Sequence, residues 1–169
     1  LNERLVGVIN ELEKVGNPTL AFLASGWEGI KVRLTAKANT EDQAIELLDT
    51  WDAKVRGQVE DLVFGVDAQN MEFVVLQKLR EKKLTLGVAE SVTGGLVAGR
   101  LTAIAGASDV FRGAIVSYDS EIKFDLLNVT KGPVVSESAA KEMAIGVRKT
   151  LGSDIGLALT GVAGPAEQD

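Results

Sequence analysis

Residues 67–169 alternate short apolar runs with segments of helical periodicity, and this alternation limits the possible folds more than any other feature of the sequence. Strands are predicted at residues 84–89, 110–117 and 154–160. Helices are predicted at residues 68–82, 96–105, 121–127 and 137–151, with Asp67 and Ser136 as caps of the first and the last. Strands that alternate with helices pair in parallel through right-handed crossovers. The sequence therefore predicts a three-layer α/β/α domain with a mainly parallel sheet.

Residues 1–66 carry a different pattern. Apolar residues at helical spacing predict a first helix, which Gly16-Asn17-Pro18 ends. The elements predicted after it are, in order, a strand at 19–24, a turn at Ser25-Gly26-Trp27-Glu28, a strand at 29–38, a helix that starts with the capping box Thr40-Glu41-Asp42-Gln43, and a strand at 61–66. We predict a small ββαβ module at residues 17–66. We interpret residues 1–16 as a helix left from a missing amino-terminal domain.

Composition narrows the class of protein. The chain has 24 acidic and 18 basic residues, a net charge of −6, and no histidine or cysteine. Nucleic-acid binding usually leaves a basic footprint, so it is not expected here. No apolar run approaches the ~18 residues of a membrane span, and no signal peptide precedes the first helix, so we expect a cytoplasmic protein without membrane contact. We expect no metal and no cofactor.

The stretch Ala89-Glu90-Ser91-Val92-Thr93-Gly94-Gly95 follows one predicted strand and precedes a helix. Ligands of open α/β sheets bind at such strand ends, where we expect an exposed Ser91 hydroxyl. The backbone N–H groups of Thr93, Gly94 and Gly95 are expected to be free for a phosphate or an oxyanion. The alternative is that Ser91 or Thr93 only caps the helix.

Parallel strands place two further turns at the same edge, Ser117-Tyr118-Asp119-Ser120 and the glycine-rich stretch 160–165. Without histidine, the base nearest to that edge is Lys123, which activates a serine only when it is unprotonated. Tyr118 can hydrogen-bond the neutral amine or relay its proton, while Arg112 and Arg100 can hold an anionic substrate group. The alternatives are a solvated lysine, an aromatic rim residue and surface ion pairs.

These residues resemble the CinA family (competence/damage-inducible protein A), whose carboxy-terminal domain resembles the nicotinamide mononucleotide deamidase PncC. The matching blocks are Ala89 to Gly95, Gly113-Ala114-Ile115-Val116-Ser117-Tyr118 with Lys123, Val135-Ser136-Glu137, and Ala158-Leu159-Thr160-Gly161-Val162-Ala163-Gly164-Pro165. Val92 stands where the family usually has cysteine. Residues 67–169 thus resemble a PncC-like amidohydrolase domain, which in the family continues through a further strand and helices. We expect sequence to be missing at both ends.

The resemblance implies hydrolysis of the carboxamide of nicotinamide mononucleotide (NMN) to nicotinic acid mononucleotide and ammonia. It implies Ser91 as nucleophile, Lys123 as base and Tyr118 in the catalytic group. The residues expected to bind substrate are Glu90, Thr93, Gly94, Gly95, Arg112, Ser117, Thr160, Gly161 and Gly164. The other function considered is a binding or assembly module, associated with competence and DNA repair, that has little activity.

The resemblance also identifies residues 17–66 as a KH-type module. Gly26-Trp27-Glu28-Gly29 spells a GXXG motif, but it lies in a predicted hairpin and carries Glu28 where a phosphate would approach. We therefore favour a spacer or dimer-contact role for this module over RNA binding. The expected partners are the small-molecule substrate NMN and a second copy of the chain in a homodimer.

Overall fold

The computed structural model describes residues 1–24 and 26–165. The chain divides into two compact units, Leu1–Met71 and Glu72–Asp169. Ser25 of the predicted turn and the last residues, 166–169, lie outside the described part. No helix in the described part is long and apolar enough to cross a membrane.

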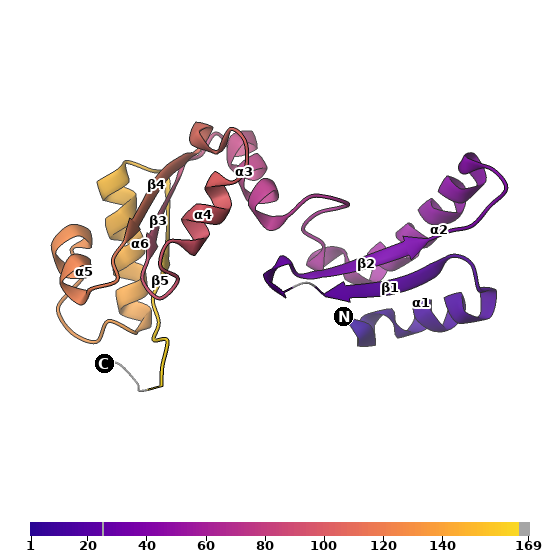
Figure 1. The fold of residues 1–169 in the computed structure, drawn as a ribbon, viewed down its shortest axis with the longest axis horizontal. Helices are drawn as coiled ribbons and strands as arrows, with labels where there is room; N and C mark the ends of the chain where they lie inside the picture. The colour runs from indigo at the N-terminus through magenta and orange to yellow at the C-terminus, as the bar shows by residue number, and fades with distance from the viewer. Residues whose placement is uncertain (25, 166–169) are drawn as a thin grey trace. The chain divides into compact units, whose positions relative to one another are not determined.

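The first unit packs two helices on one face of a hairpin (Figure 1). Its elements are α1 (Asn2–Val15), β1 (Thr19–Ala24), the 3-10 turn η1 (Gly26–Glu28), β2 (Ile30–Thr35), α2 (Glu41–Val59) and the 3-10 turn η2 (Glu60–Leu62). β1 and β2 pair antiparallel, with Thr19 opposite Thr35. Thr40 caps α2 by accepting a hydrogen bond from the backbone N–H of Gln43, as the capping box predicts.

Residues 1–16 are predicted to be separate from the module at 17–66, but in the structure they pack into it. Leu5, Val8 and Leu12 of α1 are buried in the same core as Trp51, Val55 and Val59 of α2. Alternate residues of the hairpin, including Leu20 and Leu34, pack against this core. Since both helices cover the same apolar face, α1 is part of the first unit.

The strand predicted at 61–66 is wrong, because local turns take up the backbone donors that a strand would need. The N–H of Val63 donates to the Glu60 carbonyl at 3.2 Å, and the N–H of Val66 donates to Gln69 Oε1 at 3.1 Å. Asp67 has a positive φ of 52° and does not cap a helix at residue 68. α3 (Met71–Lys82) begins four residues after it.

The second unit is built around a parallel sheet in the order β4-β3-β5. Its elements after α3 are β3 (Leu86–Glu90), α4 (Leu96–Thr102), the 3-10 turn η3 (Ala107–Asp109), β4 (Phe111–Val116), α5 (Ser120–Leu127), α6 (Glu137–Leu151) and β5 (Ile155–Leu159). The predicted strands and helices are thus present, with α4 ending at Thr102 rather than at residue 105. Ser136 caps α6 as predicted, by accepting a hydrogen bond from Ala139 N–H.

Helices cover both faces of this sheet, which confirms the three-layer prediction (Figure 1). Successive residues of the central strand point to opposite faces. Val88 belongs to a core with α3 and α4, and Ala89 belongs to a second core with α5 and α6.

Two glycines let α6 approach its neighbours closely. A Cβ atom at Gly146 of α6 would overlap the carbonyl oxygen of Leu127, at the end of α5. A Cβ atom at Gly156 of β5 would overlap the carbonyl oxygen of Ala144, in α6. Neither contact leaves room for a side chain, so the packing of α6 depends on glycine at both positions.

Candidate active site

The carboxyl ends of the three parallel strands lie together at one edge of the sheet. The N–H of Ser91, just after β3, donates to the Leu159 carbonyl at 3.0 Å. The N–H of Ser117, just after β4, donates to the Glu90 carbonyl at 2.7 Å. A Cβ atom on Gly161 would lie 3.2 Å from Val92 Cγ1. The predicted convergence of the three turns is therefore confirmed.

Ser91 is a buried residue, 5% exposed, although its position after a strand predicts an exposed hydroxyl. Its backbone is held on both sides, since its N–H donates to Leu159 and its carbonyl accepts from Gly94 N–H at 3.0 Å. Within residues 1–24 and 26–165, the Ser91 hydroxyl has no hydrogen-bond partner. The Ser91 oxygen is not among the fully buried atoms without a partner, so it keeps some contact with solvent. A hydroxyl with a fixed backbone and an unused donor is suited to react.

The side chain of Glu90, rather than Ser91 or Thr93, supplies acceptors to the start of α4. This carboxylate is fully buried. One oxygen, Oε2, accepts from the N–H groups of Gly95 and Val97 at 3.1 Å each, and Oε1 accepts from Ala98 N–H at 2.8 Å. The expected free N–H groups at Gly94 and Gly95 are therefore already bonded, Gly94 to Ser91 and Gly95 to Glu90. An internal anion occupies the amino end of α4.

These contacts keep Glu90 ionised. Burial raises the pKa of the Glu90 carboxyl, but the Thr93 hydroxyl and the amides of α4 outweigh it and hold the pKa below its ordinary value. The Thr93 hydroxyl lies near enough to stabilise this charge but outside hydrogen-bond geometry, so its oxygen is buried without a partner among the described residues. Glu90 is the acceptor that organises the turn.

Lys123 lies in the first turns of α5 and is only 2% exposed, so the alternative of a solvated lysine is wrong. Its amine donates to the Tyr118 carbonyl at 3.3 Å. Burial lowers the pKa of the Lys123 amine, and the Asp119 charge partly opposes this. Asp119 also caps α5 by accepting from Glu121 N–H at 2.8 Å. The fold therefore makes the neutral amine, which a general base requires, easier to form than in a solvated lysine.

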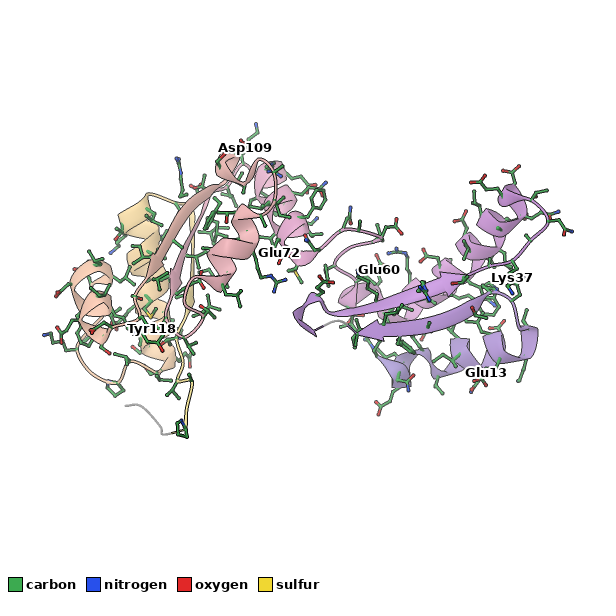
Figure 2. All side chains as sticks on the ribbon, viewed as in Figure 1. Glu13, Lys37, Glu60, Glu72, Asp109 and Tyr118 are labelled. Atoms are coloured by element: carbon green, nitrogen blue, oxygen red, sulfur yellow. The ribbon has the colours of Figure 1, made fainter. Side chains whose placement is uncertain are left out.

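Tyr118 follows β4 in the loop before α5 (Figure 2). Its side chain is turned outward and the residue is 68% exposed, as the rim alternative predicts. Within the described part of the chain, the phenol makes no hydrogen bond to Lys123, and only the backbone carbonyl contacts the amine.

Other predicted residues of this edge are tied into the scaffold. Ser117 is fully buried, and its hydroxyl donates to the Glu90 carbonyl at 3.4 Å. The Thr160 hydroxyl donates to the Val134 carbonyl at 2.7 Å, which fixes the start of the loop after β5. Gly164 lies further along this loop, with a positive φ of 78°.

The structure does not bring the two predicted arginines to the anion-binding positions expected of them. Arg112 is the second residue of β4, and its charge acts on Asp154, which precedes β5. Five residues of strand at about 3.3 Å each separate Arg112 from Ser117, so Arg112 belongs to the amino edge of the sheet. Arg100 pairs with Glu72 of α3.

Sequence reasoning missed the capping role of Glu90 and the influence of Asp119 on Lys123. A signal existed for Asp119, since an acidic residue directly before a helix often caps it. Glu90 gave none, because its partners lie five to eight residues later, beyond the spacing of a local capping motif. The described residues contain no cluster of three carboxylates able to hold a metal ion.

The sequence matches two family models. Residues 68–169 match the CinA C-terminal domain, and residues 3–65 match the damage-inducible protein CinA KH domain. The chain therefore belongs to the CinA family, and its first unit is of the KH type.

Relatives and solved structures agree with this membership. A CinA-like protein of Frankia casuarinae is 45% identical over 99% of this chain and 40% of its own length. A CinA-like protein of Dictyoglomus turgidum is 40% identical over 88% of this chain and 37% of its own. The chain thus spans about two fifths of these relatives.

Among solved structures, the competence/damage inducible protein CihA from Agrobacterium tumefaciens has a TM-score of 0.53 and 34% identity, over 62% of this chain and 67% of its own. A CinA superfamily protein from Escherichia coli has a TM-score of 0.55 and 30% identity, over 65% of this chain and 67% of its own.

Proposed function

We propose that this protein is an amidase that hydrolyses the carboxamide of NMN, with Ser91 as nucleophile and Lys123 as general base. The observation that carries the proposal is Lys123, a buried lysine whose pKa is lowered. It lies in the first turns of α5, which follows β4 at the same carboxyl edge of the sheet where Ser91 follows β3. Ser91 is a buried residue whose hydroxyl has no hydrogen-bond partner among the described residues. Membership of the CinA family supports the choice of substrate.

The reaction needs two steps of acyl transfer. In the first, the Ser91 oxygen bonds to the carboxamide carbon as its proton moves to the Lys123 amine, and the ammonium then returns this proton to the departing nitrogen, which leaves as ammonia. In the second, Lys123 takes a proton from water, the hydroxide attacks the Ser91 ester, and the acid is released as Ser91 regains its proton. No other base is needed, and the chain has no histidine.

Two features of the fold fit these roles. The Tyr118 carbonyl accepts a hydrogen bond from the Lys123 amine and so orients its lone pair and remaining hydrogens. The Tyr118 phenol, which we expected to do this, stays available to contact substrate at the rim. Glu90 holds the turn that carries Ser91 by bonding the first amides of α4.

Ammonia release from NMN tests the proposal. Ser91→Ala and Lys123→Ala should each lower kcat by at least about 10³-fold, because nucleophile and base act as one unit. Matched controls are Ser108→Ala and Lys141→Ala, which change exposed residues of the same types. Circular dichroism and thermal melting check that every variant folds. Turnover close to wild type in either site variant would refute the mechanism.

The alternative, a binding module associated with DNA repair, makes a different prediction. Titration with single-stranded DNA at two salt concentrations would give salt-sensitive binding. Such binding by a folded protein that releases no ammonia from NMN would favour the binding module over the amidase.

A further inference from the structure

After β3, some backbone N–H groups have a hydrogen-bond acceptor and others have none. Ser91 N–H donates to Leu159, Gly94 N–H to Ser91 and Gly95 N–H to Glu90. Within the part of the chain that the structure describes, the N–H groups of Val92 and Thr93 have no acceptor. Val92 directly follows Ser91, so its N–H is the unused donor nearest in sequence to the serine oxygen.

The loop after β5 offers a second unused donor, on a residue that packs against the Val92 side chain. Its start is fixed by the hydrogen bond from the Thr160 hydroxyl to Val134. The next residue, Gly161, is close enough to Val92 that an added Cβ atom would lie 3.2 Å from Val92 Cγ1. Among the described residues, no acceptor takes the Gly161 N–H.

We infer that the N–H groups of Val92 and Gly161 together form the oxyanion hole of the active site. This inference rests on the proposed function. When Ser91 attacks the carboxamide, the carbonyl oxygen gains negative charge, and two preorganised N–H donors stabilise it. A pair made from the residue after the nucleophile and from a neighbouring loop is a common arrangement in serine hydrolases.

Glu90 already occupies the other position that could stabilise this negative charge, the amino end of α4. Helix amino ends commonly bind anions through their free N–H groups. Here the N–H groups of Gly95, Val97 and Ala98 already donate to the Glu90 carboxylate. An oxyanion at α4 would compete with a fully buried negative charge, whereas Val92 and Gly161 carry unused donors.

An amide-to-ester replacement at Val92 tests the inference because it deletes the N–H and keeps the side chain. We expect kcat for NMN to fall by about 10²-fold with little change in KM, as for the loss of one oxyanion donor. This ester also weakens the Ser91 carbonyl as an acceptor of Gly94 N–H. An ester at Gly94 breaks the same hydrogen bond from the donor side and should cost much less activity.

Three outcomes separate the possibilities. A wild-type protein that releases no ammonia would refute the proposed function itself. An active wild type whose Val92 ester keeps its kcat would refute the oxyanion hole alone. Equal losses in the Val92 and Gly94 esters would assign the effect to the structure of the turn and would likewise overturn the inference.

A second pair of variants tests the contribution of Gly161. Gly161→Ala should push Val92 away by a few tenths of an ångström and lower kcat by about tenfold, since small misplacements of donors are costly. Removal of Cγ1 by Val92→Ala in the same chain should restore most of the loss. Gly99→Ala is the control, because a Cβ atom there meets nothing within 4 Å. An unimpaired Gly161→Ala, or a double variant without recovery, would contradict the pairing of these loops.

Discussion

The two edges of the parallel sheet differ in how deeply their polar side chains are buried and how fully these are hydrogen-bonded. At the carboxyl edge, Glu90, Ser117 and Lys123 are at most 2% exposed. At the amino edge, the half-buried Thr85 and the exposed Asp154 bond each other. Asp154 Oδ2 accepts from the Thr85 N–H and hydroxyl at 2.8 and 2.7 Å, and the Thr85 hydroxyl accepts from Asp154 N–H at 3.0 Å.

This difference indicates that the amino edge contributes to stability, whereas the carboxyl edge is arranged for chemistry. At the amino edge, Thr85 and Asp154 satisfy each other's hydrogen bonds and stay accessible to water, so they join β3 to β5 at little cost. Buried polar groups are costly unless fully paired, and the carboxyl edge leaves donors of Ser91 and Lys123 unused. Such local conflicts with stable packing concentrate at functional sites. The following variants test whether the two edges differ in this way.

The largest effect is expected from Lys123→Met. The variant should lose amidase activity by at least about 10³-fold but gain about 1 kcal/mol of unfolding free energy at pH 7. The pKa of Lys123 is lower in the fold than in the unfolded chain, so burial destabilises the protonated amine. This penalty is present below the folded pKa and disappears as pH rises through the unfolded value. Urea denaturation at pH 7 measures the gain, and a loss of stability would contradict it.

Next in size is Glu90→Gln, because the carboxylate accepts hydrogen bonds from three amides. We expect a loss of about 3 kcal/mol in unfolding free energy at pH 7. The pKa of Glu90 is lower in the fold, so its stabilisation is complete above the unfolded pKa and is lost as pH falls through the folded pKa. Wild type and variant should therefore converge in acid. Glu137→Gln, at an 84% exposed side chain, is the control and should change little.

A smaller effect is expected from Asp119→Asn. Asparagine caps helices as well as aspartate does, so α5 should remain intact. The Asp119 charge raises the pKa of Lys123, and its removal should lower that pKa further. The acidic limb of the kcat/KM profile should then move to lower pH, while Asp125→Asn, on the exposed side of the same helix, leaves it in place. A shift to higher pH would mean that Lys123 does not act as the base.

The smallest effects belong to the amino edge. Asp154→Ala should lower the melting temperature slightly, because Thr85 loses its partner, and should leave kcat/KM for NMN unchanged. Arg112→Ala should alter neither measurably, since Arg112 lies at the edge away from Ser91. A marked rise in KM for Arg112→Ala would restore the role in substrate binding that the sequence suggested and would break the contrast between the edges.

Periodicity and turn residues predicted most of the fold but only part of the site. The strand-to-helix order of residues 84–160 placed Ser91, Ser117 and Thr160 at one edge, because parallel strands end together. The same reasoning failed for Arg112. This residue is the second of β4, so it lies at the amino edge of the sheet and not at the carboxyl edge. The order of the motifs predicted where the site lies. The position of each residue along its strand determines whether that residue lies at the site.

Burial and hydrogen-bond partners were not predictable from the residue types. The sequence alone suggests that Lys123 is a surface lysine. The packing of α5 against the sheet encloses it. Residues 61–66 have strand-like composition, yet the turns around Val63 and Val66 consume the donors that pairing would require. In both cases tertiary and local contacts overrode a preference that the side chains alone express.

The glycines at 146 and 156 leave α6 in backbone contact with α5 and β5, and this has a consequence for how the sequence can vary. Neither position requires an unusual backbone conformation, so the restriction is purely one of space. In a saturation-mutagenesis library selected for folded protein, even alanine should be depleted at both codons. Along α6, the depth of depletion would trace the line on which the helix touches its neighbours.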